Sequence, residues 1–313
     1  MRSQVCLQPM LLAIALTVAT IPSDAQDTKP TSTSAKRAEG SYAEINGLKL
    51  YYEVHGTGGT PLILLHGGGS TIETTFGNVL PRLAESRQVV AYEQQGHGRT
   101  TDIADRPFSF EQSADDTAAL LRHLNIKQAD FFGFSNGGSI AMQVAIRHPA
   151  LVRKLVIASA MTKRNGLHPE VWKFIEQSKL ENMPREYQDA YAKLSPHPDR
   201  LRQFHDKCAK RMVDFQDWPD SDLLSINASV LIVVGDQDSI LPEHAVEMFR
   251  LLPKSQLAIL PGGHGTYIGE FTAARMKNSQ VTFDSPDAAR RKPDAIPNLV
   301  VAMITEYLDT PTP

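Results

Sequence analysis

The stretch ADFFGFSNGG, residues 129–138, runs from an apolar segment straight into a helix-like segment that continues to His148. Small residues on both sides of Ser135 permit a strained turn between strand and helix, which lifts the serine hydroxyl clear of the sheet edge. The helix that begins there points its N–H groups and its positive end at negative charge formed nearby. The alternative is a glycine-rich turn with a capping serine. In this context the pattern favours a nucleophilic serine.

Short apolar runs recur along the chain and alternate with helix-like segments. Continuous runs of this kind suit strands buried on both faces of a parallel sheet. The runs cover residues 61–65, 88–92, 129–134, 155–158, 230–234 and 256–260, and the helix-like segments include 113–124, 135–148, 243–252 and 297–308. Ahead of them, Asn46-Gly47 between two β-prone runs predicts a hairpin. The alternation predicts an α/β fold with a mostly parallel, doubly wound sheet.

One interval, residues 161–226, breaks this alternation with polar, amphipathic helical stretches. We predict a helical cap over the carboxyl edge of the sheet, inserted into a core formed by residues 41–160 and 227–313. Aromatic residues of the cap are expected to roof a mostly apolar pocket, or alternatively to form the small core of the cap itself. The predicted pocket residues are His66, Met161, Trp172 and Phe174, with Phe215 and Trp218 as further candidates. A polar stretch at 266–291 either shapes the pocket rim or extends into solvent.

Composition places the chain among globular proteins. Of its 313 residues, 42% are hydrophobic and 21% are charged, and 32 Lys and Arg oppose 35 Asp and Glu, for a net charge of −3. No global basic field is available to hold a phosphate backbone, so nucleic acid is not expected as a partner. The two cysteines, Cys6 and Cys208, exclude a disulfide framework, and no H-E-x-x-H or similar spacing predicts a metal site.

The N-terminus has the features of a targeting segment. Arg2 precedes an apolar run at 10–18, and the small residues Ser23 and Ala25 lie where a signal peptidase requires them. The run is shorter than the roughly 18 to 20 apolar residues of a membrane span, which disfavours a permanent anchor. We predict a cleaved signal peptide at 1–25, a flexible leader at 26–40, and a periplasmic or secreted protein with no membrane span after processing.

Three further loops follow strand-like runs. His66-Gly67-Gly68-Gly69-Ser70 can approach a ligand with bare N–H groups, as an oxyanion hole requires, and no Lys-Ser/Thr pair supports a phosphate-binding loop instead. Val234-Gly235-Asp236-Gln237-Asp238 and Leu260-Pro261-Gly262-Gly263-His264 close two later strands. All of these loops fall on the same edge of a parallel sheet as the serine. A nucleophile, an acid and a base therefore converge there.

Over residues 42–308 the sequence resembles the α/β-hydrolase superfamily, in which serine, acid and histidine follow in this chain order. It is most similar to esterases, enol-lactone hydrolases and cofactor-independent haloperoxidase-like members. The resemblance implies Ser135 as nucleophile, Asp238 as acid and His264 as base. It also implies backbone N–H donors at Gly68 and Asn136.

Two features qualify this resemblance. Asp238 has room to reach the next strand's loop, whereas Asp236 lies close to its own strand end and is expected to bond turn N–H groups. Residues 93–100, EQQGHGRT, stand where such enzymes usually show D-x-R-G-x-G-x-S. That loop normally supports the cap and the sheet edge, so the departure bears on substrate detail more than on mechanism.

These observations predict a serine hydrolase that cleaves a small ester or lactone through an acyl-enzyme intermediate and needs no cofactor. A carbon–carbon bond hydrolase or lyase using the same serine is one alternative. A non-catalytic ligand-binding member is another, because a fold alone does not settle function. The sequence names neither the physiological substrate nor the oligomeric state.

Overall fold

A computed structural model describes residues 40–270 and 295–311. The predicted signal peptide, nearly all of the predicted leader and residues 271–291 of the polar stretch lie outside these ranges. Within them, no helix is both long enough and apolar enough to cross a bilayer. The same ranges contain no group of three or more His, Cys, Asp and Glu side chains placed to hold a metal ion.

Eight strands form one sheet in the order β1-β2-β4-β3-β5-β6-β7-β8. They are β1 Ser41–Ile45, β2 Leu48–His55, β3 Leu62–Leu65, β4 Val89–Tyr92, β5 Ala129–Phe134, β6 Val152–Ala158, β7 Ser229–Gly235 and β8 Ser255–Leu260. β1 pairs antiparallel with β2 and β2 with β4, and every later pair is parallel. Asn46 and Gly47 both have positive φ, 49° and 83°, as a two-residue hairpin turn requires. The mostly parallel α/β fold and its hairpin are confirmed.

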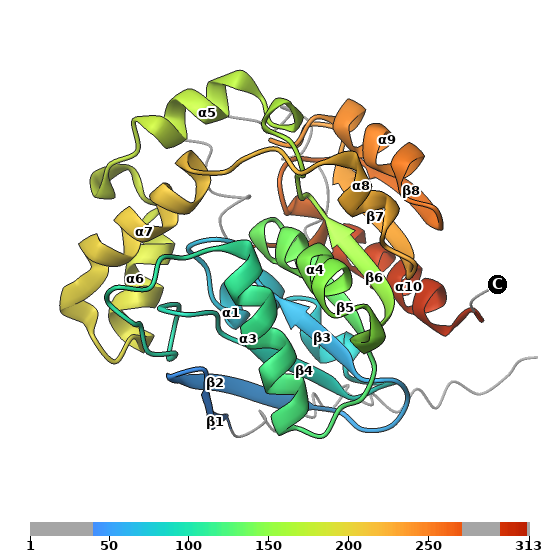
Figure 1. The fold of residues 1–313 in the computed structure, drawn as a ribbon, viewed down its shortest axis with the longest axis horizontal. Coiled ribbons are helices and arrows are strands. Elements are labelled where there is room, and N and C mark those ends of the chain that lie inside the picture. The colour runs from blue at the N-terminus through green and yellow to red at the C-terminus, as the bar shows by residue number, and fades with distance from the viewer. Residues whose placement is uncertain (1–39, 271–294, 312–313) are drawn as a thin grey trace, which may run out of the picture. The chain divides into compact units, whose positions relative to one another are not determined.

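Helices cover both faces of this sheet (Figure 1). Against one face lie α3 Phe110–His123, α4 Asn136–Arg147, α8 Asp220–Leu224 and α9 Pro242–Leu251, and against the other α1 Ile72–Phe76, α2 Leu80–Leu83 and α10 Ala295–Asp309. Short 3-10 helices span Pro149–Leu151, Arg164–Gly166, Leu180–Asn182, Pro198–Arg200 and Thr266–Ile268.

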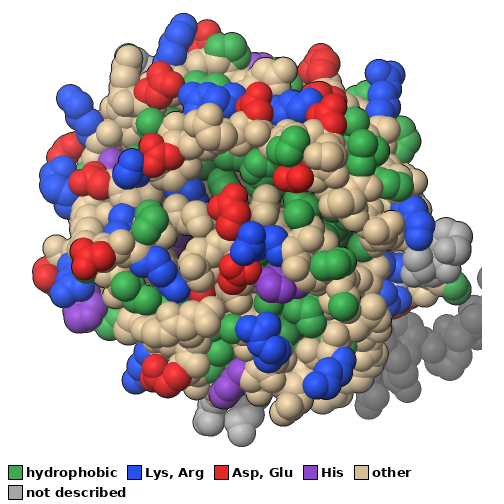
Figure 2. All heavy atoms as spheres, in the orientation of Figure 1, with side chains coloured by type: hydrophobic (Ala, Val, Ile, Leu, Met, Phe, Trp, Pro, Cys, Tyr) green, Lys and Arg blue, Asp and Glu red, His purple; other side chains and the backbone are tan. Residues whose placement is uncertain are grey.

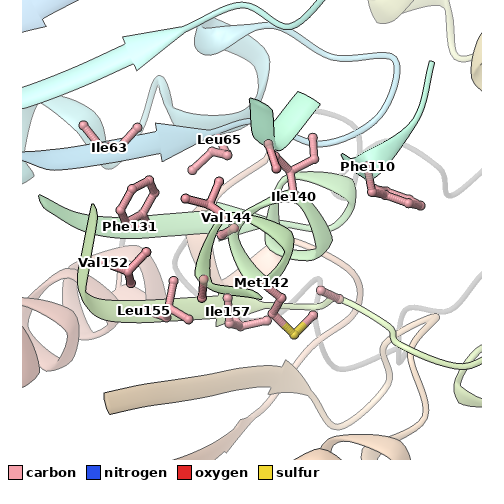
Figure 3. Packing of buried hydrophobic residues seen from close by; sticks show 14 of the residues in the cluster. Ile63, Leu65, Phe110, Phe131, Ile140, Met142, Val144, Val152, Leu155 and Ile157 are labelled. Atoms are coloured by element: carbon pink, nitrogen blue, oxygen red, sulfur yellow. The ribbon is translucent and has the colours of Figure 1, made fainter. Parts of the chain in front are cut away.

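Successive strand side chains point to opposite faces of the sheet, which divides the core into two layers. Leu65 and Phe131 gather with Ile157 around Ile140 and Val144 of α4 (Figure 3). Their strand neighbours contribute to the layer beneath α1, α2 and α10. Burial on both faces explains why the central strands read as continuous apolar runs.

β8 departs from that expectation. Its residues are mostly half-buried or exposed, and Ile259 is 45% exposed, whereas β7 is buried almost throughout. β8 is the last strand of the sheet and has a neighbour on one side only. The prediction that residues 256–260 are buried on both faces is therefore wrong, because strand order decides burial at an edge.

Between β6 and β7 the chain forms α5 Pro169–Glu176, α6 Arg185–Leu194 and α7 Leu201–Val213, followed by α8. Figure 1 shows α5, α6 and α7 standing away from the sheet, beyond α4 and the ends of the strands. An ion pair fastens α7 to the body: Nζ of Lys207 lies 2.8 Å from Oδ2 of Asp102. On the face drawn in Figure 2, Lys and Arg side chains are interspersed with Asp and Glu.

Candidate active site

Ser135 lies at the corner where β5 ends and α4 begins, with its backbone at φ 53° and ψ −123°. Residues with a side chain rarely adopt positive φ, so this conformation is strained. Glycines close the corner: a Cβ atom at Gly133 would lie 2.2 Å from the carbonyl oxygen of Gly137, and one at Gly137 would lie 2.0 Å from that of Leu65. Only glycine fits at either position, and this close packing places Ser135 at the carboxyl edge of the sheet.

His264 follows β8 and Asp238 follows β7, and the parallel pairing of these strands brings the two residues together. Nδ1 of His264 donates to Oδ1 of Asp238 over 2.7 Å. Burial opposes charge on both groups, yet the pKa of Asp238 is lowered by His264 and by further donors. The pKa of His264 is raised against its own burial by the carboxylates of Asp238 and Glu270. With the proton on Nδ1, Nε2 is the ring nitrogen able to accept another.

Further donors converge on the Asp238 carboxylate, which is 1% exposed. The backbone N–H groups of Ile240 and Gly235 donate to its two oxygens over 3.0 and 3.2 Å, and Oγ of Ser159 donates to Oδ2. Ser159 Oγ lies 2.5 Å from the hydroxyl of Tyr267. Sequence reasoning missed Ser159, although it directly follows an apolar run and so belongs to the same sheet edge as the other loop residues.

Asp236 has a different environment. Its Oδ1 accepts the backbone N–H of Gly262 over 2.8 Å, a bond between the loops after β7 and β8. The structure thus places Asp238, and not Asp236, against the imidazole. The expectation that Asp236 bonds a loop N–H group agrees with this geometry.

The loop after β3 runs beside the serine corner, and Gly68, Asn136 and Ser135 all line one cavity. Within the part of the chain that the structure describes, neither the N–H of Gly68 nor that of Asn136 has a hydrogen-bond acceptor. A Cβ at Gly68 would lie 2.2 Å from the Asn136 side-chain amide nitrogen, so any larger residue at this position would displace that amide. Two N–H groups are therefore available beside the serine.

His66, predicted to line the pocket, lies beneath this loop. Its ring is fully buried, with Nδ1 donating to the carbonyl of Gly67 over 2.8 Å and Nε2 accepting the N–H of Gln94 over 3.1 Å. Burial lowers its pKa to about 4, which keeps the ring neutral. The pocket assignment of His66 is wrong, because the backbone partners of the ring hold it away from the cavity.

The loop at 93–100 contacts the loop after β3, residues 66–70, and is linked to α7. The N–H of Gly69 donates to Nε2 of buried His97 over 3.3 Å. Gln95 donates to Asp102 over 2.7 Å, the same carboxylate that pairs with Lys207 of α7. Glu93 and Thr100, the other departures from the family pattern, are buried within the loop itself. The altered residues still connect the sheet edge to the cap.

The cavity over Ser135 has a volume of about 330 Å³ and a mostly apolar lining contributed by the sheet edge and by the cap. Met161 and Phe174 line it, as predicted from the sequence. The other apolar lining side chains are Phe134, Leu167, Val171, Ile175, Met183, Pro184, Met212 and Ile240. Although several polar side chains also line it, most of the cavity surface is apolar, so the cavity suits a small, largely apolar ligand.

Trp172 does not belong to this lining. Its indole N–H donates to the carbonyl of Arg164 over 2.6 Å, the guanidinium of Arg164 lies 3.9 Å from the ring centroid, and the side chain is 8% exposed. Phe215 and Trp218 pack instead against Phe110 of α3. These three assignments are corrected, because none of the three rings lines the cavity: Phe215 and Trp218 pack the insertion against α3, whereas Trp172 contacts Arg164 within the insertion itself.

A family profile described as alpha/beta hydrolase fold matches residues 60–221. The chain belongs to this family. A Pseudomonas putida protein, the dihydrolipoyllysine-residue acetyltransferase component of an acetoin cleaving system, is 31% identical over 76% of this chain and 67% of its own length. The 2-hydroxymuconate semialdehyde hydrolase of Pseudomonas sp. strain CF600 is 29% identical over 72% of this chain and 88% of its own. The enol-lactonase of Burkholderia xenovorans LB400 shares the fold, with a TM-score of 0.63 at 18% identity over 86% of this chain and all of that one.

In this α/β hydrolase, sequence reasoning missed a contact at the cavity between α6 and the segment after β8. The hydroxyl of Tyr187 in α6 donates to Oε1 of Glu270 over 2.5 Å, and both residues line the cavity. Glu270 is 4% exposed, and its carboxylate contributes to the raised pKa of His264. No periodicity marks Glu270, which lies in an irregular stretch, so only the fold could reveal it.

Proposed function

We propose that this hydrolase cleaves a small ester or lactone through an acyl-enzyme formed on Ser135. The observation that carries the proposal is that a strained serine, the His264–Asp238 pair and two available N–H groups border one apolar cavity. Each group matches one requirement of acyl transfer.

In the first half-reaction Nε2 of His264 takes the proton of the Ser135 hydroxyl as its oxygen attacks the carbonyl carbon. The carbonyl π electrons move onto oxygen, and the N–H groups of Gly68 and Asn136 stabilise that oxyanion. When the oxyanion collapses, the bond to the leaving oxygen breaks and the imidazolium returns the proton to it. Water, deprotonated by the same histidine, then cleaves the acyl-enzyme.

The cavity supports a small acyl group rather than a polymer. Its volume of about 330 Å³ lies at the low end for ligand pockets, and Met161 and Phe174 provide apolar contact. Side chains of the cap form much of the lining, so substrate choice depends on α5, α6 and α7.

A second candidate is hydrolysis of a carbon–carbon bond in a vinylogous diketone. The observation favouring it is the similarity to a protein named 2-hydroxymuconate semialdehyde hydrolase, in which the match extends over 88% of that protein's length. The same serine, base and N–H groups would serve, with carbon in place of oxygen as the leaving atom. The two candidates differ only in the bond that breaks.

The test compares Ser135→Ala with a matched control, Ser113→Ala. Ser113 is a buried helical serine whose hydroxyl donates to the carbonyl of Ser109, away from the cavity. Purified protein is assayed on p-nitrophenyl acetate and butyrate, on a γ-lactone and on a dienoic diketone. We expect turnover of esters or lactones by the wild type and the control, and loss in Ser135→Ala. Turnover of the diketone alone would favour the second candidate, and binding without any turnover would indicate a ligand-binding member.

We also propose that the chain is exported after cleavage near residue 25, and that residues 161–226 form a helical cap over the carboxyl edge of the sheet. N-terminal sequencing of the mature protein from fractionated cells tests the first point. A mature chain that begins at Met1 in the cytoplasm would contradict it.

A further inference from the structure

Arg211 of α7 is a buried arginine without a carboxylate partner. Its side chain is 5% exposed, and Nη1 donates to Oε1 of Gln94 over 3.3 Å. Nε and Nη2 are both buried and have no hydrogen-bond partner, and among the described residues no Asp or Glu forms an ion pair with this guanidinium. Burial lowers the pKa of Arg211, but an arginine pKa starts so high that the group stays charged at neutral pH.

Two other arginines show how this chain ordinarily uses the same atoms. Arg147 donates through Nε and Nη2 to Asp115 over 3.0 and 2.7 Å, and Arg153 does so to Asp130 over 2.8 and 2.5 Å. The Nε–Nη2 edge is the side of a guanidinium that matches a carboxylate. At Arg211 the Nε–Nη2 edge meets no carboxylate of the described residues, so no neighbouring negative charge neutralises the guanidinium.

The guanidinium lies directly behind the loop after β3, residues 66–70, which we call the oxyanion loop. Nη2 of Arg211 is 3.4 Å from the position that a Cβ would take on Gly68. Gln94, which accepts from Arg211, also donates through its side-chain amide to the carbonyl of His66 over 2.7 Å. Two hydrogen bonds thus connect Arg211 of α7 through Gln94 to His66, the first residue of the loop.

Aromatic rings hold the guanidinium in this place. Its Cζ lies 5.8 Å from the ring centroid of Phe108 and 5.4 Å from that of Phe110. The neighbouring residues Cys208 and Met212 on α7 line the cavity, whereas Arg211 stays behind the loop. A fixed charge that is excluded from water, such as this guanidinium, interacts strongly with charge that develops nearby, because little solvent screens the interaction.

We propose that Arg211 is a positioning residue for the oxyanion loop: through Gln94 it fixes the loop, and its unneutralised charge lies behind the Gly68 N–H that receives the oxyanion. This inference rests on the proposed acyl transfer at Ser135. Burying the Arg211 charge without a counter-ion costs free energy. That cost is then offset only in the transition state, when the negatively charged oxyanion forms on the other side of the loop. A carboxylate of the substrate would be the other occupant of such a charge, but Nε and Nη2 are buried and Arg211 does not line the cavity over Ser135.

The test uses Arg211→Met and Arg211→Lys, with Arg87→Met as the matched control. Arg87 is also buried, at 3% exposed, and its Nε also has no partner. It pairs with Asp309 and lies just before β4, at the amino ends of the parallel strands, whereas Ser135 lies at their carboxyl ends. A unit charge about 6 to 8 Å from the oxyanion, at an effective dielectric constant of about 20, corresponds to a rate effect of roughly 30- to 100-fold. We expect Arg211→Met to lower kcat on a neutral ester by that factor with KM changed less than about threefold.

Three readouts separate this role from a structural one. Arg211→Met is expected to weaken binding of an alkyl boronic acid, which forms an anionic tetrahedral adduct with Ser135, and to leave binding of a neutral ketone of the same shape unchanged. Its Tm is expected to stay level or rise, because an apolar side chain replaces a lone buried charge. Arg211→Lys is expected to recover part of kcat, and Arg87→Met to lower Tm at wild-type kcat.

Wild-type kcat in Arg211→Met would overturn the proposal, as would equal losses of boronate and ketone binding. A loss confined to KM for esters that carry a carboxylate would overturn it too and assign Arg211 to substrate binding. Failure of the proposed function itself looks different: wild-type protein would then turn over none of the esters, or Ser135→Ala would retain their turnover.

Discussion

Replacing Asp238 by asparagine tests the acid of the site with almost no change in shape. The carboxylate receives five donors: Nδ1 of His264, the N–H of Ile240 and Oγ of Ser239 at Oδ1, and Oγ of Ser159 and the N–H of Gly235 at Oδ2. An asparagine keeps one acceptor oxygen and turns the other into an NH₂ group. Whichever way the amide is oriented, at least two donors then face a donor.

The two orientations have different consequences. If the amide oxygen faces His264, the Ser159 hydroxyl can rotate to accept, and the N–H of Gly235 loses its partner at a cost of about 1–3 kcal/mol. If the NH₂ faces His264, the ring must carry its proton on Nε2 and cannot accept the serine proton. In both cases the negative charge opposite the imidazolium is gone. We expect kcat to fall about 10⁴-fold, with Tm lowered by a few degrees.

The assay is kcat on the best ester found for the wild type, with Asp236→Asn as control. Among the described residues, the Asp236 carboxylate accepts only the loop N–H of Gly262 and forms no hydrogen bond with the imidazole. We expect this control to stay within about threefold of the wild type, since a loop hydrogen bond contributes about 1 kcal/mol. A crippled Asp236→Asn beside a mild Asp238→Asn would refute the assignment of the acid.

Four further outcomes follow from the site. Ser135→Ala is expected to lower kcat by about 10⁴- to 10⁶-fold at unchanged Tm and to abolish labelling by a fluorophosphonate; persistent activity or labelling would exclude Ser135 as nucleophile. Because a base must be neutral and the pKa of His264 is raised, kcat/KM is expected to rise with pH through an inflection above the ordinary histidine value of about 6.5, and a flat profile between about pH 5 and 8 would argue against a histidine base. Phe174→Ala is expected to change the preference between short and long acyl esters by about 10- to 200-fold. Trp172→Ala is expected to lower Tm by several degrees with equal effects on all esters, and an altered chain-length preference there would contradict its place outside the cavity.

Elements governed by local pattern could be predicted well. The hairpin at Asn46-Gly47 and the glycine-flanked corner at Ser135 depend on φ/ψ preferences of a few adjacent residues, and these act in any tertiary context. The convergence of loops at one edge follows from parallel pairing, which buried apolar runs indicate. The same rule, applied to the residue after the run at 155–158, would have found Ser159.

Burial of particular side chains could not be predicted in this way. An amphipathic helix shows which residues are apolar, but it does not show whether its apolar face meets a cavity or another helix, and so Trp172 and Phe174 look alike in the sequence. His66 looks like a pocket residue until its Nε2 is seen to accept the backbone N–H of Gln94, 28 positions later in the chain, beneath the loop. Exposure of β8 depends on its place at the end of the strand order.

The amino-acid sequence by itself determined the α/β fold, the strained serine corner and the residues available for acyl transfer, because each depends on short-range backbone preferences or on the period of apolar residues. Only the tertiary structure decided how closely Asp238 meets His264, which aromatic rings face the cavity, and that among the described residues no carboxylate lies beside the charge of Arg211. These outcomes depend on contacts between residues far apart in the chain. The pairing of β7 with β8 and the seating of α7 on the loop after β3 bring those residues together, and no local pattern records either contact.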